Sequence, residues 1–258
     1  MPIHHSHGIT YVTSEALESH GVKHGFFMRH GGCSPRPWKS LNMATTVGDT
    51  RENVIENTFR IADALQIGRK SFYDLWQVHS NRVVIADRPR PLDNEHIQAD
   101  AIVTSKDQVA LLMLFADCVP LLFYDPEKKV IAIAHAGWKG TLNGIAAETI
   151  KVMTENFLST HENIIGVIGP AICHDHYQIE RDVVDKTKTV FGTEDNVITY
   201  QNKKTFLDLP LSNRLILEKY RIKTIETIDI CTMCYKEDWF SHRGENGKTG
   251  RFAAVISL

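Results

Sequence analysis

The apolar residues of the chain fall into short runs with two different periods, and these periods predict alternating strands and helices. Near-continuous apolar runs over 109–115, 119–124 and 130–134 are typical of strands that are covered on both faces. Other strands are predicted from shorter runs at 9–13, 25–28, 72–78, 82–86, 164–168, 197–200, 222–227 and 251–256. A turn at His79 would join the strands on either side of it in a hairpin.

Apolar residues spaced three or four apart predict the helices. A helix over about 50–65 is expected to begin at a capping box formed by Asp49 and Glu52. Thr141 is expected to cap a second helix that continues to Phe157. The remaining helices are predicted at 182–190 and 209–220. No repeat or linker divides the chain, so we predict one domain over 1–258, of α/β or α+β class, with a large buried sheet.

Composition narrows the class of protein without changing this picture. With 258 residues, 43% hydrophobic residues and a net charge of −2, the chain is ordinary for a soluble globular enzyme, and no basic excess favours nucleic acid. The longest apolar run, 109–116, is too short to cross a membrane, which takes about 20 residues. No secretory signal is visible, and an odd number of cysteines fits a reducing compartment, so we expect a cytoplasmic protein. No coiled coil or apolar stripe demands a partner, so we expect a monomer.

Three side chains of the kind that bind metals stand at the ends of predicted strands. They are His79 in LWQVHS, Cys118 in FADCVPLLFYD and His135 in IAIAHAGWKG. Two imidazoles and a thiolate suit Zn²⁺, with copper as a rival, and three ligands leave a position open for water or substrate. Each residue taken alone is better explained as a core or turn residue. The repeated design, an apolar strand that stops at a ligand-type residue, favours one shared metal site.

Cations beside glycines are candidates for binding an anionic substrate. Lys139 follows a glycine turn where a helix begins, a geometry that favours phosphate; the alternative is a tight turn with a solvated lysine. Arg29 in MRHGG and Arg243 in SHRGENG also stand next to glycines, where backbone can approach a ligand closely. Ordinary surface arginines are the alternative for both. The GKT triplet at 247–249 is no P-loop, because His242 stands where the first glycine is required.

The other cysteines and histidines have simpler interpretations. Cys231 and Cys234 form a C-x-x-C motif, but no second such pair exists, so we expect two buried thiols and no zinc ribbon. His174 and His176 are interpreted as polar groups of a loop, with a part in a metal site as the alternative. A frayed terminus is expected to hold His4, His5 and His7.

Several motifs, taken in order, resemble the YfiH/YlmD family of laccase-domain proteins, also labelled multicopper polyphenol oxidases. They are QVHS, ADAIVT, FADCVPLLFYD, AHAGWKG, GPAI and FSHRGENGKTGRFAAVI. The resemblance runs from RHGG and SLN near the start to the last strand. It implies a layered α/β/β/α sandwich and one zinc ion held by His79, Cys118 and His135. It also implies phosphorolysis of adenosine, inosine and methylthioadenosine, together with adenosine deaminase activity.

Two positions depart from the pattern of this family. Thr46 precedes Val47-Gly48-Asp49, where the family usually has histidine, so a polar ring is missing there. Lys139 follows AGW, where arginine is frequent, which keeps the positive charge but loses the bidentate guanidinium.

The resemblance, joined to the residues, predicts a division of roles among the candidates. A zinc ion on the three ligands would activate water or polarise a substrate oxygen, so His79, Cys118 and His135 are also the catalytic candidates. Asp117 would shuttle a proton in deamination. The expected substrates are a purine nucleoside and phosphate, and the phosphate-binding cations are Arg29, Lys139 and Arg243.

Alternative functions remain open at this point. A copper-dependent phenol oxidase needs several copper sites, and His174-x-His176 is its only internal candidate motif. A metal-free hydrolase would use Cys118 as the nucleophile and His135 as its base. A binding protein without turnover would hold zinc and act on no nucleoside.

Overall fold

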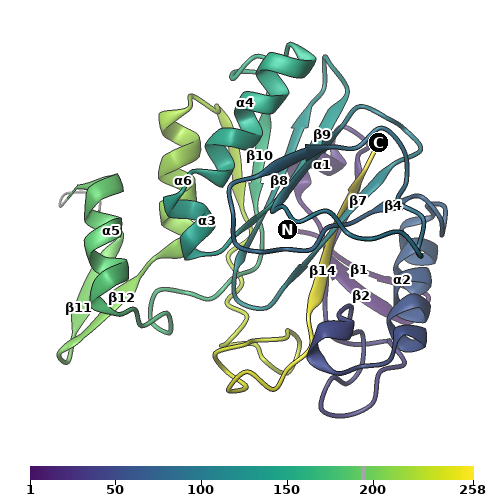
Figure 1. The fold of residues 1–258 in the computed structure, drawn as a ribbon, viewed down its shortest axis with the longest axis horizontal. Helices are drawn as coiled ribbons and strands as arrows, with labels where there is room; N and C mark the ends of the chain where they lie inside the picture. Colours follow the sequence, from purple (N-terminus) through teal and green to yellow (C-terminus); the bar gives the residue numbers. More distant parts are fainter. Residues whose placement is uncertain (193–195) are drawn as a thin grey trace.

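Two six-stranded sheets stack face to face and helices cover both outer faces, which gives an α/β/β/α sandwich (Figure 1). The computed structural model describes residues 1–192 and 196–258. The first sheet has the order β1 (Ile3–Ser6), β2 (Ile9–Val12), β3 (Lys23–Phe27), β14 (Phe252–Ser257), β7 (Ala110–Phe115) and β4 (Phe72–Tyr73). The second has the order β13 (Thr224–Thr227), β10 (Ile165–Ile168), β8 (Val119–Asp125), β9 (Val130–Ala136), β6 (Ala101–Thr104) and β5 (Val83–Ile85).

The helices are divided between the two outer faces. Helix α2 (Arg51–Leu65) covers the first sheet, on the right in Figure 1. On the second sheet, at the left, lie α3 (Trp138–Leu142), α4 (Ile145–Phe157) and α6 (Leu209–Lys219). The other elements are α1 (Glu15–Glu18), the 3-10 helix η1 (Thr45–Val47), α5 (Arg181–Phe191) and the hairpin of β11 (Ile198–Gln201) and β12 (Lys204–Leu207). No helix in the described part of the chain is both long and apolar enough to cross a membrane.

The apolar runs are continuous because the central strands are buried on both faces. Leu122 of β8 and Leu111 of β7 lie in the core between the two sheets. Their neighbours in the chain face the other way: Leu121 packs beneath α4 and α6, and Leu112 packs with Ile61 of α2. Successive strand residues point to opposite faces, so a strand between two cores must be apolar at every position. The predicted fold class, a layered α/β/β/α sandwich, is confirmed.

The predicted hairpin around His79 is wrong. Strand β4 pairs in parallel with β7 in the first sheet, whereas β5 pairs in parallel with β6 in the second. The segment that contains His79 therefore crosses from one sheet to the other. Its backbone N–H groups at Val78, His79 and Ser80 donate to the carboxylate of Asp100 and to no partner strand.

The predicted long helix capped by Thr141 is divided in two. Gly144 has a positive φ of 83°, which interrupts the helix between α3 and α4, and α3 begins with Gly137 as its N-cap. Thr141 lies inside α3, where its hydroxyl accepts a hydrogen bond from the Asn213 side chain at 3.0 Å. This contact ties α3 to α6.

Smaller differences concern the ends of other elements. The first helix of the sequence prediction is confirmed as α2, but its N-cap is Thr50, whose hydroxyl accepts from the Asn53 N–H at 3.3 Å. The N-terminal histidines lie on or beside the paired strand β1, whose register joins His4 to Tyr11, so the terminus is not frayed. Strands β6 and β12 were not predicted, because runs of four residues give little periodicity.

Candidate active site

The fold brings His79, Cys118 and His135 together from three separate segments. Cys118 directly precedes β8, His135 lies on the neighbouring strand β9, and His79 lies on the segment that crosses between the sheets. One ligand atom from each residue lies within 4.8 Å of the other two. The two imidazoles are 4.7 Å apart between ring centroids. We refer to these three residues as the His-Cys-His trio.

Asp100, which the sequence analysis did not single out, orients two members of the trio. Its side chain is fully buried at the start of β6 and accepts a hydrogen bond from His135 Nδ1 at 2.9 Å. With Nδ1 engaged in this way, His135 has Nε2 left for a ligand. The same carboxylate accepts from the His79 N–H at 3.0 Å and the Ser80 N–H at 2.6 Å. A carboxylate behind a metal-binding histidine fixes the tautomer and orientation of the ring.

The pKa values of the two histidines of the trio are shifted in opposite directions. Burial, followed by the charge of His135, lowers the pKa of His79 to about 4, although the ring is exposed where it faces the cavity. Burial acts in the same direction on His135, but the Cys118 thiolate and the Asp100 carboxylate outweigh it and raise the pKa of His135 to about 9. His79 is therefore ready to bind a cation, whereas a cation at His135 would displace a proton.

Gly137 allows the trio to come this close. A Cβ atom at this position would lie 2.8 Å from His79 Nδ1 and 2.9 Å from Cys118 Sγ. The φ of Gly137 is −72°, which any residue adopts, so contact with the trio is the reason that a side chain is excluded.

The trio lines a cavity of about 1080 Å³. Its lining includes residues of α2, the η1 turn and the segment before His79, together with Trp138, Tyr177 and Arg243. Gln77 fixes the segment before His79, because its side chain exchanges two hydrogen bonds with the backbone of Leu114, at 2.8 and 2.9 Å. A cavity of this size holds a small organic molecule.

Of the predicted anion-binding residues, Arg243 lines the cavity and Arg29 does not. The guanidinium of Arg29 forms an ion pair with Glu245 at 3.1 Å and donates to the carbonyl of Lys236 at 2.6 Å. It also stacks over the Phe240 ring, so its contacts are structural. Lys139 is exposed beside Trp138 on α3, a helix of five residues, and is not among the residues that line the cavity.

Asp117 is buried, and its carboxylate accepts three hydrogen bonds from the protein. It accepts from Thr232 Oγ1 and Ser241 Oγ, each at 2.7 Å, and from the backbone N–H of Arg243 at 2.6 Å. These bonds hold the C-terminal loop against the residue that precedes Cys118. The geometry suits a positioning role better than the proton shuttle predicted from the sequence.

Sequence reasoning missed Arg251, a residue that lines the cavity near Cys118. Arg251 directly precedes the last strand, β14. Burial lowers the pKa of Arg251, and the nearby Cys118 and Asp117 partly offset this effect. Its N–H donates to Asn42 Oδ1 at 2.9 Å, which anchors the residue. Asp100 had a sequence signal, since it opens the apolar run AIVT, but Arg251 had none beyond its charge. Thr46, one of the two departures noted above, also lines the cavity.

Comparison with known proteins agrees with this geometry. A family model described as "Multi-copper polyphenol oxidoreductase laccase" matches residues 23–258. The chain belongs to this family. The resemblance predicted from the motifs is thereby confirmed.

The relatives of this laccase-domain chain include proteins with a printed activity. It is 36% identical over 244 residues to the purine nucleoside phosphorylase YlmD of Bacillus subtilis (strain 168), which covers 91% of this chain and 87% of the relative. It is 37% identical over 237 residues to a purine nucleoside phosphorylase of Deinococcus radiodurans, covering 92% and 89%. The crystal structure of YlmD from Geobacillus stearothermophilus superposes with a TM-score of 0.92 at 30% identity, covering 98% and 97%.

Proposed function

We propose that the protein is a metal-dependent purine nucleoside phosphorylase, and that 1–258 is one catalytic domain. The observation that carries the proposal is the His-Cys-His trio, held by Asp100 and open to a cavity of about 1080 Å³. Relatives that match nearly the whole chain bear this activity in their names. Adenosine, inosine and methylthioadenosine are the proposed nucleosides, with adenosine deamination as a second reaction.

The donor set of the trio fits zinc. Two imidazoles and one thiolate are a borderline-soft set, and three ligands match the open sites of catalytic zinc proteins; copper is the rival metal. The carboxylate of Asp100 supplies the outer support that such a site requires. When bound, zinc would act as a Lewis acid toward an oxygen of water or substrate.

The residues of the chain would bind the substrates around this centre. Trp76 and Tyr177 offer aromatic surface for a purine base, and both line the cavity. In phosphorolysis a phosphate oxygen forms a bond to C1′ of the ribose while the bond from C1′ to the base breaks. We assign the positioning of the phosphate to Arg243 and Arg251, the two arginines in the wall beside the trio, in place of the Arg29 expected from the sequence. The role of Lys139 in binding phosphate stays a prediction, and this residue does not line the cavity.

In deamination, water adds to C6 of adenine and ammonia leaves. We place Asp117 as a positioning residue in this reaction, because its carboxylate already accepts three hydrogen bonds from the loop that carries Arg243. His79, Cys118 and His135 are the residues that would hold the metal ion.

The proposal is tested with tag-free protein assayed on inosine, with and without phosphate. Phosphorolysis predicts hypoxanthine and ribose 1-phosphate in equal amounts, only with phosphate, lost on chelation and restored by zinc. Turnover that survives chelation would favour the alternative in which Cys118 is a nucleophile and His135 its base. Oxidation of phenols with consumption of oxygen, dependent on copper, would favour the oxidase named in the family description.

We further propose that the chain acts in the cytoplasm as a monomer. All five cysteines are free thiols in the structure, which suits a reducing compartment. Size-exclusion chromatography with light scattering measures the oligomeric state directly.

A further inference from the structure

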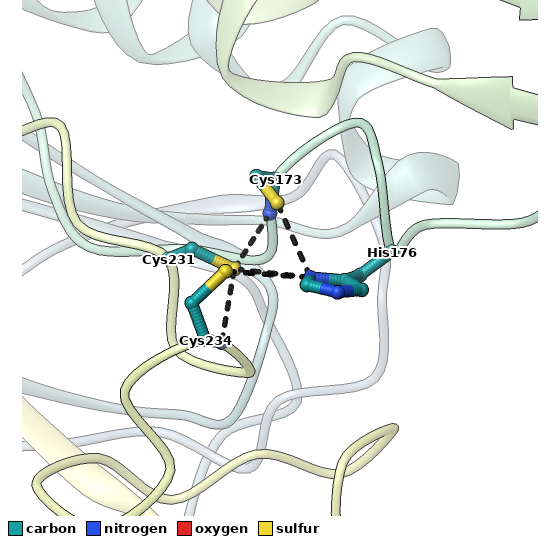
Figure 2. Close-up of side chains that lie close together, drawn as sticks. All are labelled: Cys173, His176, Cys231 and Cys234. Atoms are coloured by element: carbon teal, nitrogen blue, oxygen red, sulfur yellow. Dashed lines mark hydrogen bonds between the residues drawn. The ribbon is translucent and has the colours of Figure 1, made fainter.

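A second group of metal-type side chains lies outside the His-Cys-His trio. Cys173, His176, Cys231 and Cys234 each direct one ligand atom to a common point, and all four atoms lie within 4.8 Å of one another. Figure 2 shows the three sulfurs and the imidazole facing one another from two loops. We call these four residues the Cys₃His cluster. The sequence interpretation of Cys231 and Cys234 as two buried thiols is wrong, since Cys234 is exposed and both face His176.

The distances within the cluster match those of a tetrahedral zinc site. His176 Nδ1 lies 3.4 Å from Cys173 Sγ, 3.7 Å from Cys231 Sγ and 3.5 Å from Cys234 Sγ. Zinc bound tetrahedrally, with Zn–S of about 2.3 Å and Zn–N of about 2.0–2.1 Å, places each sulfur roughly 3.5–3.6 Å from the nitrogen. The three distances fall on both sides of this value. An ordinary hydrogen bond would bring the imidazole close to one sulfur and not to all three.

The topology of the second sheet creates this cluster. Strands β10 and β13 are parallel neighbours, so the segments that follow them leave the sheet at the same end. An isolated parallel bridge between Ala171 and Cys231 continues the pairing beyond the strands. The cluster then joins a C-x-x-H motif at 173–176 to a C-x-x-C motif at 231–234. Two short ligand pairs from separate loops are the usual construction of closed structural zinc sites.

Two backbone N–H groups donate hydrogen bonds to the sulfur of Cys231. The N–H groups of Cys173 and Cys234 donate to Cys231 Sγ at 3.3 and 3.4 Å. Hydrogen bonds of this kind stabilise a thiolate, which is the form that binds a metal. The four ligands leave no open position, so the site would be structural and not catalytic.

The Cys₃His cluster sits behind the wall of the active-site cavity. Tyr177, the residue after His176, lines the cavity. The carbonyl of His176 accepts from the Arg243 guanidinium at 3.3 Å, and Thr232 donates to the Asp117 carboxylate at 2.7 Å. A metal ion here would therefore hold in place the two loops that position Tyr177 and Arg243.

We infer that Cys173, His176, Cys231 and Cys234 bind a second, structural zinc ion that fixes this wall of the cavity. The inference goes beyond the proposed function and does not depend on it. The number of zinc ions per chain distinguishes the Cys₃His cluster from the His-Cys-His trio, because different substitutions remove the two sites.

The experiment measures zinc per chain by mass spectrometry in tag-free protein purified with zinc present. The expected result is two zinc ions in the unaltered chain, one in Cys118→Ala, one in Cys231→Ser and none in the double variant. His174→Ala is the matched control for His176→Ala, because His174 is its neighbour but pairs with Asp175 and Asp208 outside the cluster. His174→Ala should keep two zinc ions, and His176→Ala should bind the second ion at least tenfold more weakly.

Cobalt substitution supplies a signature that zinc cannot give. Cobalt-loaded Cys118→Ala should show the strong visible bands of a tetrahedral ion and the sulfur-to-cobalt charge transfer of three thiolates. Should Cys231→Ser not fold, Cys118→Ala still decides the question by alkylation. Cys173, Cys231 and Cys234 should react only after chelation, whereas Cys33, an exposed thiol outside both sites, should react throughout.

Two results would overturn the inference. One is a Cys118→Ala chain that holds no zinc and whose three cluster thiols react without chelator. The other is a disulfide bond among these cysteines in the native protein. If both zinc ions bind but inosine is not cleaved, only the proposed function fails.

Discussion

Asp100 and His135 form a buried pair in which the carboxylate accepts from the imidazole Nδ1 at 2.9 Å, and this pair orders the whole candidate metal centre. The carboxylate also accepts hydrogen bonds from the backbone N–H groups of the crossing segment that carries His79. One side chain thus sets the orientation of two ligands, one on strand β9 and one on the segment that crosses between the sheets. We expect it to control metal affinity more than any residue outside the trio.

Replacing Asp100 by asparagine tests this role. We expect zinc affinity at the trio to fall about 10- to 100-fold, the usual effect of removing a carboxylate behind a metal-binding histidine. Affinity is measured by competition with a chromophoric chelator. Asp107→Asn, an exposed acid on a turn outside the site, is the control and should bind zinc as the unaltered chain does. Equal affinities in the two variants would show that Asp100 does not support the metal.

Alanine at Gly137 tests how closely the ligands must approach. The new Cβ would lie within 3 Å of both His79 Nδ1 and Cys118 Sγ, so we expect at least a tenfold loss of zinc affinity or of turnover. The backbone conformation suits alanine, so the free energy of unfolding should change by no more than about 1 kcal/mol. Gly68→Ala is the matched control, because its Cβ would meet Ser71 Cβ at an ordinary 3.7 Å. Full zinc binding by Gly137→Ala would contradict the close approach.

The stability of the metal-free protein should depend on pH through His135. The pKa of His135 is raised to about 9 in the folded state, against about 6.5 in an unfolded chain. A raised folded pKa means that the contribution is present below pH 6.5 and is lost as the pH rises to about 9. We expect a loss on the order of 2–3 kcal/mol in the free energy of unfolding over this window. Guanidinium denaturation of chelated protein measures the loss.

The matched variant for this pH effect is His135→Gln, which has no group that titrates at this position. It should show a flatter profile between pH 6.5 and 9 than the unaltered chain. Zinc-loaded protein should also lack the decline, because a bound ion keeps the imidazole neutral. A decline of equal size in His135→Gln would assign the effect to another group.

The two arginines proposed for phosphate from the sequence should behave differently. Arg29→Gln breaks a largely buried ion pair with Glu245, so we expect a loss of about 2–4 kcal/mol in stability with the KM for phosphate nearly unchanged. Arg243→Gln should raise the KM for phosphate about tenfold or more, since Arg243 lines the cavity. Steady-state kinetics of both variants at several phosphate concentrations separate the two effects. The opposite pattern would return Arg29 to the substrate site.

Local pattern was sufficient for the α/β class and for selecting the three residues of the trio, whereas the layered sandwich was implied by the family resemblance. Strands β7, β8 and β9 are apolar at nearly every position, and their ends mark Cys118 and the turn after His135. The position of β5 was not predictable in this way. Its short run looks the same in a hairpin with β4 as in the second sheet, and only tertiary packing decides between the two.

The residues that were missed depend on contacts between distant segments. Asp100 acts through His79 and His135, which lie on two other elements. Cys173 and Cys231 meet because β10 and β13 are parallel neighbours, and no local spacing records this. The lack of a second C-x-x-C motif is therefore weak evidence against a metal site. The other ligands can come from any loop at the same end of a sheet.

The most direct test of the proposed activity is the release of products from inosine by the unaltered chain and by Cys118→Ala. We predict hypoxanthine and ribose 1-phosphate in equal amounts from the unaltered chain. We expect at least a hundredfold slower release from Cys118→Ala, which should still contain the zinc of the Cys₃His cluster. Phosphorolysis at an unchanged rate in Cys118→Ala, or none in a zinc-loaded unaltered chain, would contradict the proposed function.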